Sequence, residues 1–295
     1  AGVTDTHSVA IDWGDGTRGD SAVVTRDATD PTLVRFTASH IYVDDDPTTS
    51  SSDIYTMTMI ASDDDTGRAD EEEEIRVADL APVVTVGTIA GTTENVGITM
   101  IASFTDAGTA DSHTAVVDWG DGTPVHPVAI AASAGGGSLT ANHTYGDNGV
   151  FTVTVTVTDD DSLSGSDSTT VTVVNTVPMV AIDRSGTTTF DGVQTVVGSQ
   201  GVPTPFSGSV SDPGSDDVTV TWAYGDALSD SATNLVNPPA TDPAVSPSIQ
   251  PRSFTSSVTH AYARPCLYTA TMSAVDDDGG APRDYVASDG RARVS

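Results

Sequence analysis

The sequence predicts an all-β chain in which antiparallel β-sandwiches follow one another in an extended array. Three observations predict this fold class: a composition rich in Thr, Val, Ser, Asp and Gly with only 5% aromatic residues, short stretches in which apolar and polar residues alternate, and a set of motifs that occurs three times. Alternation with a period of two places every second side chain on one face of a strand. Short strands of this kind, separated by Asp/Gly turns, are typical of a sandwich.

The repeat is clearest where residues 1–17 align without a gap with residues 107–123, at an offset of 106 residues. Both segments contain the motif D-W-G-D-G-T. A weaker third copy begins at Asp212 and contains W-A-Y-G-D, with Tyr224 at the position of the motif tryptophan. Repetition of a domain-sized unit indicates an array of similar domains.

Two further motifs follow in the same order in every copy. The first is an H-x-Y triplet, found at 40–42, 143–145 and 260–262. The second is a run of three aspartates, found at 63–65, 159–161 and 276–278. Three motifs that recur three times in one order exclude chance similarity.

Between the H-x-Y triplet and the aspartates lies the clearest strand of each copy. Residues 151–157 read F-T-V-T-V-T-V, so the phenylalanine and the valines share one face and the threonines the other. Residues 55–61 and 268–274 show the same pattern. A second alternating strand is predicted at 98–104, and its counterpart in the third copy at 206–210.

Short polar steps followed by proline mark the expected domain boundaries, because proline is tolerated at the start of a strand. We expect domains at 1–80, 81–176 and 177–295, joined by linkers of about two to four residues that favour a stiff rod. The first domain lacks its first two strands, which indicates a piece of a longer chain in preference to strands supplied by another chain. The third carries a Pro-rich insert at 234–251, for which an inter-subunit contact is one hypothesis.

The charge balance restricts the partners. The chain has 42 acidic residues against 11 basic ones, all arginine, and a net charge of −31. Nucleic acids and anionic membranes require cationic patches, so we expect neither as a partner. The charge fits divalent cations, high salt or solubility through repulsion. No apolar stretch approaches the ~20 residues of a membrane-spanning helix, and the single cysteine, Cys266, excludes an intrachain disulfide.

Together, the D-W-G-D-G motif, the H-x-Y triplet, the alternating strand ending in D-D-D and the N-x-x-P step at 175–178 resemble the polycystic kidney disease (PKD) domain. The resemblance covers essentially the whole chain and is weaker in the third copy, where W-A-Y-G-D lacks the first Asp and the last Gly. It implies a seven-stranded immunoglobulin-like sandwich of the kind found in surface-layer proteins, adhesins and accessory modules of secreted hydrolases. It implies no enzymatic activity.

The repeated motif residues are expected to have structural roles. Trp119 supplies the large apolar anchor of a core, Asp118 accepts hydrogen bonds from turn amides, and Asp121-Gly122 forms a tight turn with a positive φ. In the third copy we expect a different turn, because Ala227 replaces the glycine. Zinc needs three or four converging N or S ligands, so the histidines are assigned to the core or to hydrogen bonds. The structural set comprises Trp13, Asp15, Trp119, Asp121, Tyr224, His40, Tyr42, His143, Tyr145, His260 and Tyr262.

The carboxylate clusters are the candidate metal ligands. Ca²⁺ takes about six to eight oxygen ligands, and adjacent aspartates concentrate a like charge that a divalent cation relieves. The resemblance implies calcium near the domain junctions. The implied ligands are Asn175, Asp159 and Asp161 with Asp106 for the second copy, and Asp212, Asp276 and Asp278 for the third. A solvated acidic turn is the alternative for each cluster, and Glu71–Glu74 is interpreted as a solvated run.

These patterns favour a non-catalytic extracellular or cell-surface array, such as a stalk, surface layer or filament, stabilised by calcium. Its expected partners are other modules of the same protein, a homopolymer or a cell-surface assembly. The alternative is a carbohydrate- or protein-binding accessory module of a secreted hydrolase, which needs a row of exposed aromatic residues. Only three tryptophans are present, two of them in the repeated motif. An enzyme is disfavoured because the sequence has no G-x-S-x-G elbow and one active site does not call for repeated motifs.

Overall fold

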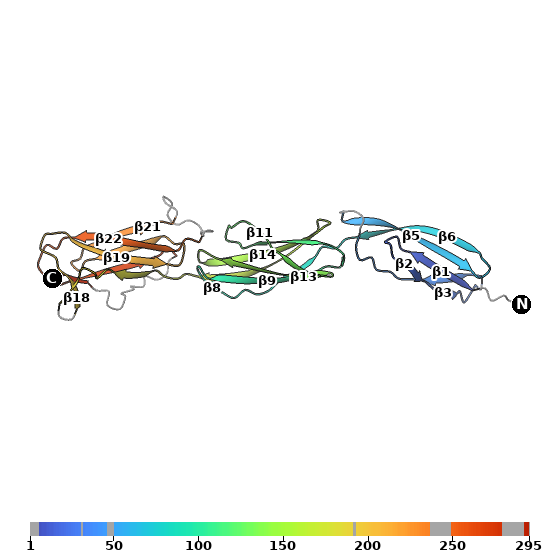
Figure 1. The fold of residues 1–295 in the computed structure, drawn as a ribbon, viewed down its shortest axis with the longest axis horizontal. Coiled ribbons are helices and arrows are strands. Elements are labelled where there is room, and N and C mark those ends of the chain that lie inside the picture. Colours follow the sequence, from blue (N-terminus) through green and yellow to red (C-terminus); the bar gives the residue numbers. More distant parts are fainter. Residues whose placement is uncertain are drawn as a thin grey trace.

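The computed structural model describes residues 6–30, 32–45, 50–190, 193–236, 249–278 and 292–294. All regular structure in these ranges is β, and the strands pair in predominantly antiparallel sheets, so the predicted fold class is confirmed. Figure 1 shows three β units in a row, with most strands running along its long axis. We call them the first (6–78), second (83–174) and third unit (179–294). In the described part of the chain, no helix has the length and apolar character needed to cross a membrane.

The second unit is a two-sheet sandwich. One sheet has the strand order β11-β10-β14-β15-β8 and the other β12-β13-β9-β7. All pairs are antiparallel except β8 with β15. The strands are β7 (Val83–Val86), β8 (Thr92–Thr93), β9 (Gly97–Thr105), β10 (His113–Asp118), β11 (His126–Pro127), β12 (Ile130–Ser133), β13 (Gly136–Thr144), β14 (Gly149–Asp159) and β15 (Ser164–Val174).

The core of the second unit lies where the alternating strands predict it. Phe151 is 4% exposed, and the three valines that share its face of β14 are fully buried. The apolar face of β9 packs against them, with Met100 fully buried, and Trp119 closes this core at 1% exposure. Each such side chain contributes about 1.5–3 kcal/mol on burial.

The first unit repeats half of this plan. Its four-stranded sheet has the order β2-β1-β5-β6, and a separate hairpin pairs β3 with β4. The core of this unit is small among the described residues: Val9, Ile11 and Trp13 are buried, while Met57 and Met59 of β5 are half-buried. The strands are β1 (His7–Asp12), β2 (Arg18–Ser21), β3 (Val23–Arg26), β4 (Val34–Thr37), β5 (Ser52–Asp63) and β6 (Arg68–Ala78). The glutamates 71–74 lie on β6 and are exposed, as expected of a solvated run.

The third unit pairs a three-stranded sheet, β16-β19-β22, with a six-stranded sheet, β17-β18-β24-β23-β20-β21. Trp222 and Tyr224 are each 1% exposed in its core. The strands are β16 (Met179–Ile182), β17 (Thr188–Phe190), β18 (Val193–Val196), β19 (Thr204–Asp212), β20 (Val218–Ala223), β21 (Ser229–Asn234), β22 (Arg252–His260), β23 (Tyr268–Val275) and β24 (Ala292–Val294). Most of the Pro-rich insert, residues 237–248, lies outside the described residues, and so does its hypothetical contact.

The turn after the motif aromatic residue has a left-handed residue at the same position in all three units. Its second residue has φ values of 82° and 84° at Gly16 and Gly122, and Ala227 adopts 73° at the equivalent position. The expectation of a different turn in the third unit is therefore wrong. The Asp226 carboxylate accepts a hydrogen bond from the Leu228 amide at 3.2 Å and holds the turn closed, so alanine is held in a left-handed conformation that favours glycine.

Replacing Ala227 with glycine should therefore stabilise the third unit. Relief of the left-handed strain stabilises the folded state by about 1–2 kcal/mol. The greater freedom of glycine in the unfolded chain opposes this by about 0.5–1 kcal/mol, so the free energy of unfolding should rise by up to about 1 kcal/mol. Urea unfolding of the Ala227→Gly chain measures this gain. Ala223→Gly, on the adjoining strand, is the control and should destabilise. A lower midpoint for Ala227→Gly would contradict the assignment of strain.

Candidate metal centres at the junctions between units

The predicted structural residues form one contact set that recurs in every unit. In the second unit His143 stacks on Trp119 with ring centroids 4.6 Å apart, and its Nε2 lies 2.7 Å from Asp121 Oδ2. The Tyr145 hydroxyl donates to the Trp119 carbonyl at 3.0 Å. Burial opposes ionisation of Asp121, but hydrogen bonds from Thr123 and His143 lower its pKa. The equivalent sets are Trp13, His40, Asp15 and Tyr42 in the first unit, and Tyr224, His260, Asp226 and Tyr262 in the third.

A different group of side chains gathers where one unit meets the next. The units are joined there by a backbone hydrogen bond at equivalent positions: the Ala110 amide donates to the Val43 carbonyl at 3.3 Å, and the Ser215 amide to the Gly146 carbonyl at 2.8 Å. Loops and strand ends around these bonds bring carboxylates of both units together. The matching positions are Asp44/Asp147, Asp79/Asn175, Asp106/Asp212, Asp111/Asp216, Asp159/Asp276 and Asp161/Asp278.

The first junction contains two clusters of potential ligands. In each cluster the ligand atoms lie within 4.8 Å of one another. One cluster consists of Asp106, Asp111 and His113, in which His113 Nε2 lies 2.9 Å from Asp106 Oδ2. The other consists of Asp44, Asp45 and Asp161. A cavity of about 130 Å³ between the units is lined in part by Asp44, Asp45, Asp79 and Asp111.

The second junction also contains two clusters, with the same 4.8 Å limit between ligand atoms. Asp212, Asp216 and Asp276 form one of them. The Asn175 amide donates to Asp276 Oδ2 at 2.9 Å, which holds the linker against this cluster. Glu94, Asp147, Asp216 and Asp278 form the other, so Asp216 belongs to both.

Buried oxygens at both junctions lack hydrogen-bond donors. A buried acceptor without a partner costs about 1–3 kcal/mol, and such groups in native proteins call for an explanation, such as an ion. These atoms are all carboxylate or amide oxygens, the ligand type that Ca²⁺ prefers, so the residues present fit calcium. They are Asp45 Oδ2, Asp79 Oδ2, Glu94 Oε1, Asp111 Oδ2, Asp159 Oδ2, Asn175 Oδ1, Asp212 Oδ2 and Asp216 Oδ2.

The electrostatics agree with this interpretation. Burial, and then the charges of Asp212, Asp278 and Asp147, raise the pKa of Glu94 to about 8. Burial, followed by the charge of Glu94, raises the pKa of Asp216 to about 9. Burial with nearby aspartates also raises the pKa values of Asp79, Asp111 and Asp212 to about 6. Without a cation, these sites resist carrying their full negative charge.

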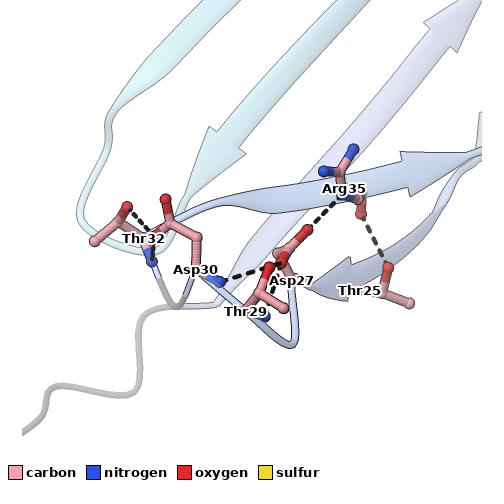
Figure 2. Close-up of polar contacts among 6 residues, drawn as sticks. All are labelled: Thr25, Asp27, Thr29, Asp30, Thr32 and Arg35. Atoms are coloured by element: carbon pink, nitrogen blue, oxygen red, sulfur yellow. Dashed lines mark hydrogen bonds and ion pairs between the residues drawn. The ribbon is translucent and has the colours of Figure 1, made fainter.

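The loop between β3 and β4 provides an internal contrast (Figure 2). Asp27 Oδ1 accepts hydrogen bonds from Thr29 and Asp30 amides at 2.8 and 3.1 Å, and its Oδ2 accepts one from Arg35 Nε at 2.6 Å. Asp30 accepts from the Thr32 amide at 2.9 Å. The hydrogen bonds from Thr29, then Arg35, lower the pKa of Asp27. These carboxylates have protein donors, whereas the junction oxygens named above have none.

The structure distributes the predicted ligands over both junctions. Asp106, Asp159 and Asp161 lie at the first, and Asp212, Asp276 and Asp278 at the second. The grouping of Asn175 with Asp159 and Asp161 is wrong. Asp159 ends β14 and Asn175 follows β15, so the paired length of these strands, about 30 Å, separates them.

Sequence reasoning missed other members of the clusters. Asp79 and Asn175 each stand three residues before a linker proline, and this shared spacing could have identified Asp79. Asp111 was visible in the repeat alignment but was not assigned as a ligand. Asp44 and Asp147 each follow the H-x-Y tyrosine by two residues, which is a weaker signal. The missed residues are Asp44, Asp45, Asp79, Glu94, Asp111, His113, Asp147 and Asp216.

Fold and junctions together define a tandem array of immunoglobulin-like β-sandwich repeats with acidic joints. Models of the PKD domain match residues 79–174 and 189–287. The chain therefore belongs to the PKD domain family and contains two PKD domains in tandem.

Solved structures similar to the chain include a tetra-tandem repeat from the extending region of a large adhesion protein, at 17% identity and a TM-score of 0.42. The match covers 98% of this chain and 64% of that one, so the chain spans less than two thirds of its length. A structure of a 1.5-MDa bacterial ice-binding adhesin, described in terms of host cell surface retention, matches at 13% identity and a TM-score of 0.26, covering 100% of this chain and 85% of that one. No curated protein matches the sequence.

Proposed function

We propose that the chain is a non-catalytic structural or adhesive segment of an extracellular or cell-surface protein, in which calcium stabilises each domain at its junction with the preceding one. Membership of the PKD family supports the structural role. The observation that carries the calcium proposal is the set of buried oxygens without donors at both junctions, two pairs of which, Asp79/Asn175 and Asp111/Asp216, stand at equivalent positions. The net charge of −31 disfavours nucleic acid as a partner.

The calcium site proposed here is the cluster that each domain builds around its own strand ends. In the third unit the ligands are Asp212 at the end of β19, Asp276 after β23, Asp216, and Asn175 of the linker. The first junction supplies Asp106, Asp111, Asp159 and Asp79 at the matching positions. These ligands lie on segments far apart in the sequence, so a bound cation joins two strand ends of one domain to the linker that precedes it.

Millimolar Ca²⁺ should raise the thermal midpoint of the chain and EDTA should lower it. Binding to the folded state alone stabilises by about 2.7 kcal/mol at a ligand concentration 100-fold above Kd, which corresponds to about 10 °C or more for a 100-residue domain. Calorimetry with and without calcium measures the shift. Asp212→Asn should abolish it for the third unit, whereas Glu72→Gln, on an exposed strand, should leave it intact. Identical midpoints in calcium and EDTA would refute calcium binding.

The alternative, an accessory module that binds carbohydrate through aromatic side chains, receives less support. The three tryptophans are buried, with exposures of 8%, 1% and 1%, so none is available for a sugar-binding platform. Retention of the chain on insoluble polysaccharide would favour this alternative instead.

A further inference from the structure

The two clusters at each junction differ in which units supply their ligands. The cluster of Asp212, Asp216 and Asp276 comes entirely from the third unit. The other cluster at that junction combines Glu94 and Asp147 of the second unit with Asp216 and Asp278 of the third. At the first junction, Asp44 and Asp45 of the first unit likewise meet Asp161 of the second. We call these mixed sets the bridging clusters.

The bridging clusters contain deeply buried oxygens without donors. Glu94 is 1% exposed and Asp45 is 3% exposed, yet Glu94 Oε1 and Asp45 Oδ2 have no hydrogen-bond partner. The second carboxylate oxygen of Glu94 fixes the side chain, because Oε2 accepts a hydrogen bond from the Thr176 amide of the linker at 2.8 Å. Gly214 permits this close approach of Glu94, because a Cβ atom at position 214 would lie only 2.8 Å from Glu94 Oε2. The free oxygen of Glu94 is thus positioned beside carboxylates of the next unit.

Charge compensation also requires more than one cation at the second junction. Its two clusters together contain six carboxylates. With all six ionised, one divalent cation would leave four negative charges and two would leave two. Asp278 is exposed, and the other five carboxylates are buried. Asp216 is shared between the clusters, so its two oxygens can serve neighbouring cations. Because buried like charges are costly unless compensated, a second divalent cation is favoured over the uptake of protons by the remaining carboxylates.

We propose that each bridging cluster binds a second divalent cation, Ca²⁺, whose ligands come from both adjoining units. This inference deepens the calcium binding proposed above and rests on it. The cation of a domain's own cluster stabilises that domain, whereas the bridging cation fixes the orientation of two domains. Withdrawal of the bridging cation removes the ligand that the carboxyl groups of both units share, so the two domains are no longer held in one orientation. The bending stiffness of the array is therefore set by calcium.

Glu94→Gln tests the proposal on the full chain, since glutamine keeps an oxygen that can accept the Thr176 amide and removes only the charge. Native mass spectrometry with Ca²⁺ as the sole divalent ion should count one calcium fewer in this variant than in the unmodified chain. Small-angle scattering in calcium should show its radius of gyration and maximum dimension shifted toward the EDTA values. The calcium-dependent rise in thermal midpoint of the third unit should persist. Asp45→Asn should cause the same loss of one ion at the first junction.

Asp212→Asn is the matched control, because it should remove the thermal shift of the third unit. Two results would overturn the proposal of a bridging cation: an unchanged ion count in both Glu94→Gln and Asp45→Asn, or scattering in calcium identical to that of the unmodified chain. Either result would leave the proposal of calcium binding within each domain intact. A chain that binds no calcium at all would overturn both proposals.

Discussion

In the presence of EDTA, the third unit should be more stable at pH 5 than at pH 8. The folded pKa values of Asp216, about 9, and Asp212, about 6, lie above those of unfolded carboxyls. A carboxyl with a raised folded pKa binds its proton more tightly in the native state, so its stabilising contribution is complete below about pH 4 and is lost as the pH rises through the folded value. At about 1.4 kcal/mol per pKa unit, partly offset because the charged site relaxes to admit water, this loss should lower the midpoint by about 10 °C.

Calorimetric scans at pH 5, 6.5 and 8 measure this dependence. Saturating calcium should reverse its direction, because carboxylate ligands must be deprotonated to bind the metal and the ligand set is complete only at the higher pH. Carboxylates with lowered pKa values oppose the trend only at acidic pH. They include Asp183 and Asp226 in the third unit, and Asp27 and Asp30 in the first. A midpoint in EDTA that rises from pH 5 to pH 8 would show that the junction carboxylates are solvated instead.

Trp119→Ala should unfold the second unit selectively. Trp119 is 1% exposed, its ring stacks on His143, and its carbonyl accepts the Tyr145 hydroxyl. Removing a buried tryptophan side chain costs about 3–5 kcal/mol, which is a large fraction of the total stability of a domain of this size. Calorimetry should show one transition strongly lowered or lost. The same substitution at Trp13, which is 8% exposed in a smaller core, provides the comparison and should cost less.

Transitions lowered equally by Trp119→Ala and Trp13→Ala would contradict the ranking of the two cores. A parallel loss of the third unit's transition would indicate that the junctions couple the units more strongly than their few contacts suggest.

Strands and cores were predictable because their signal is local. On β14, Phe151 and the alternating valines specify one buried face without reference to any other part of the chain. The contacts of His143 were harder to predict. The sequence argued against a zinc site, but it did not identify Asp121 as the hydrogen-bond partner of this histidine. The turn at Ala227 was mispredicted because a strain of about 1–2 kcal/mol is smaller than the energy with which the flanking strands β20 and β21 fix the turn.

The junction clusters were only partly predictable, because their composition depends on how two separately folded units approach each other. Asp276 and Asp278 belong to a repeated acidic run and were found, but Asp216 is one aspartate among many in a loop. Glu94 has no counterpart among the described residues of the first unit, so the repeat could not identify it. Its significance follows only from its burial beside Asp216 of the next unit.

The route of the chain through the second unit has a mechanical consequence. β7 starts at Val83, next to the first junction, and runs toward the second, while β15 ends at Val174, next to the second. Tension applied to the two ends of the array pulls β7 lengthwise along its partner β9. The backbone hydrogen bonds between these strands, from the Val83/Thr105 pair to the Val86/Ala102 pair, are then loaded in shear and share the force. Resistance to rupture under such load depends on the unfolding rate and not on equilibrium stability. A domain traversed in this way is suited to bearing tension along the axis of the array.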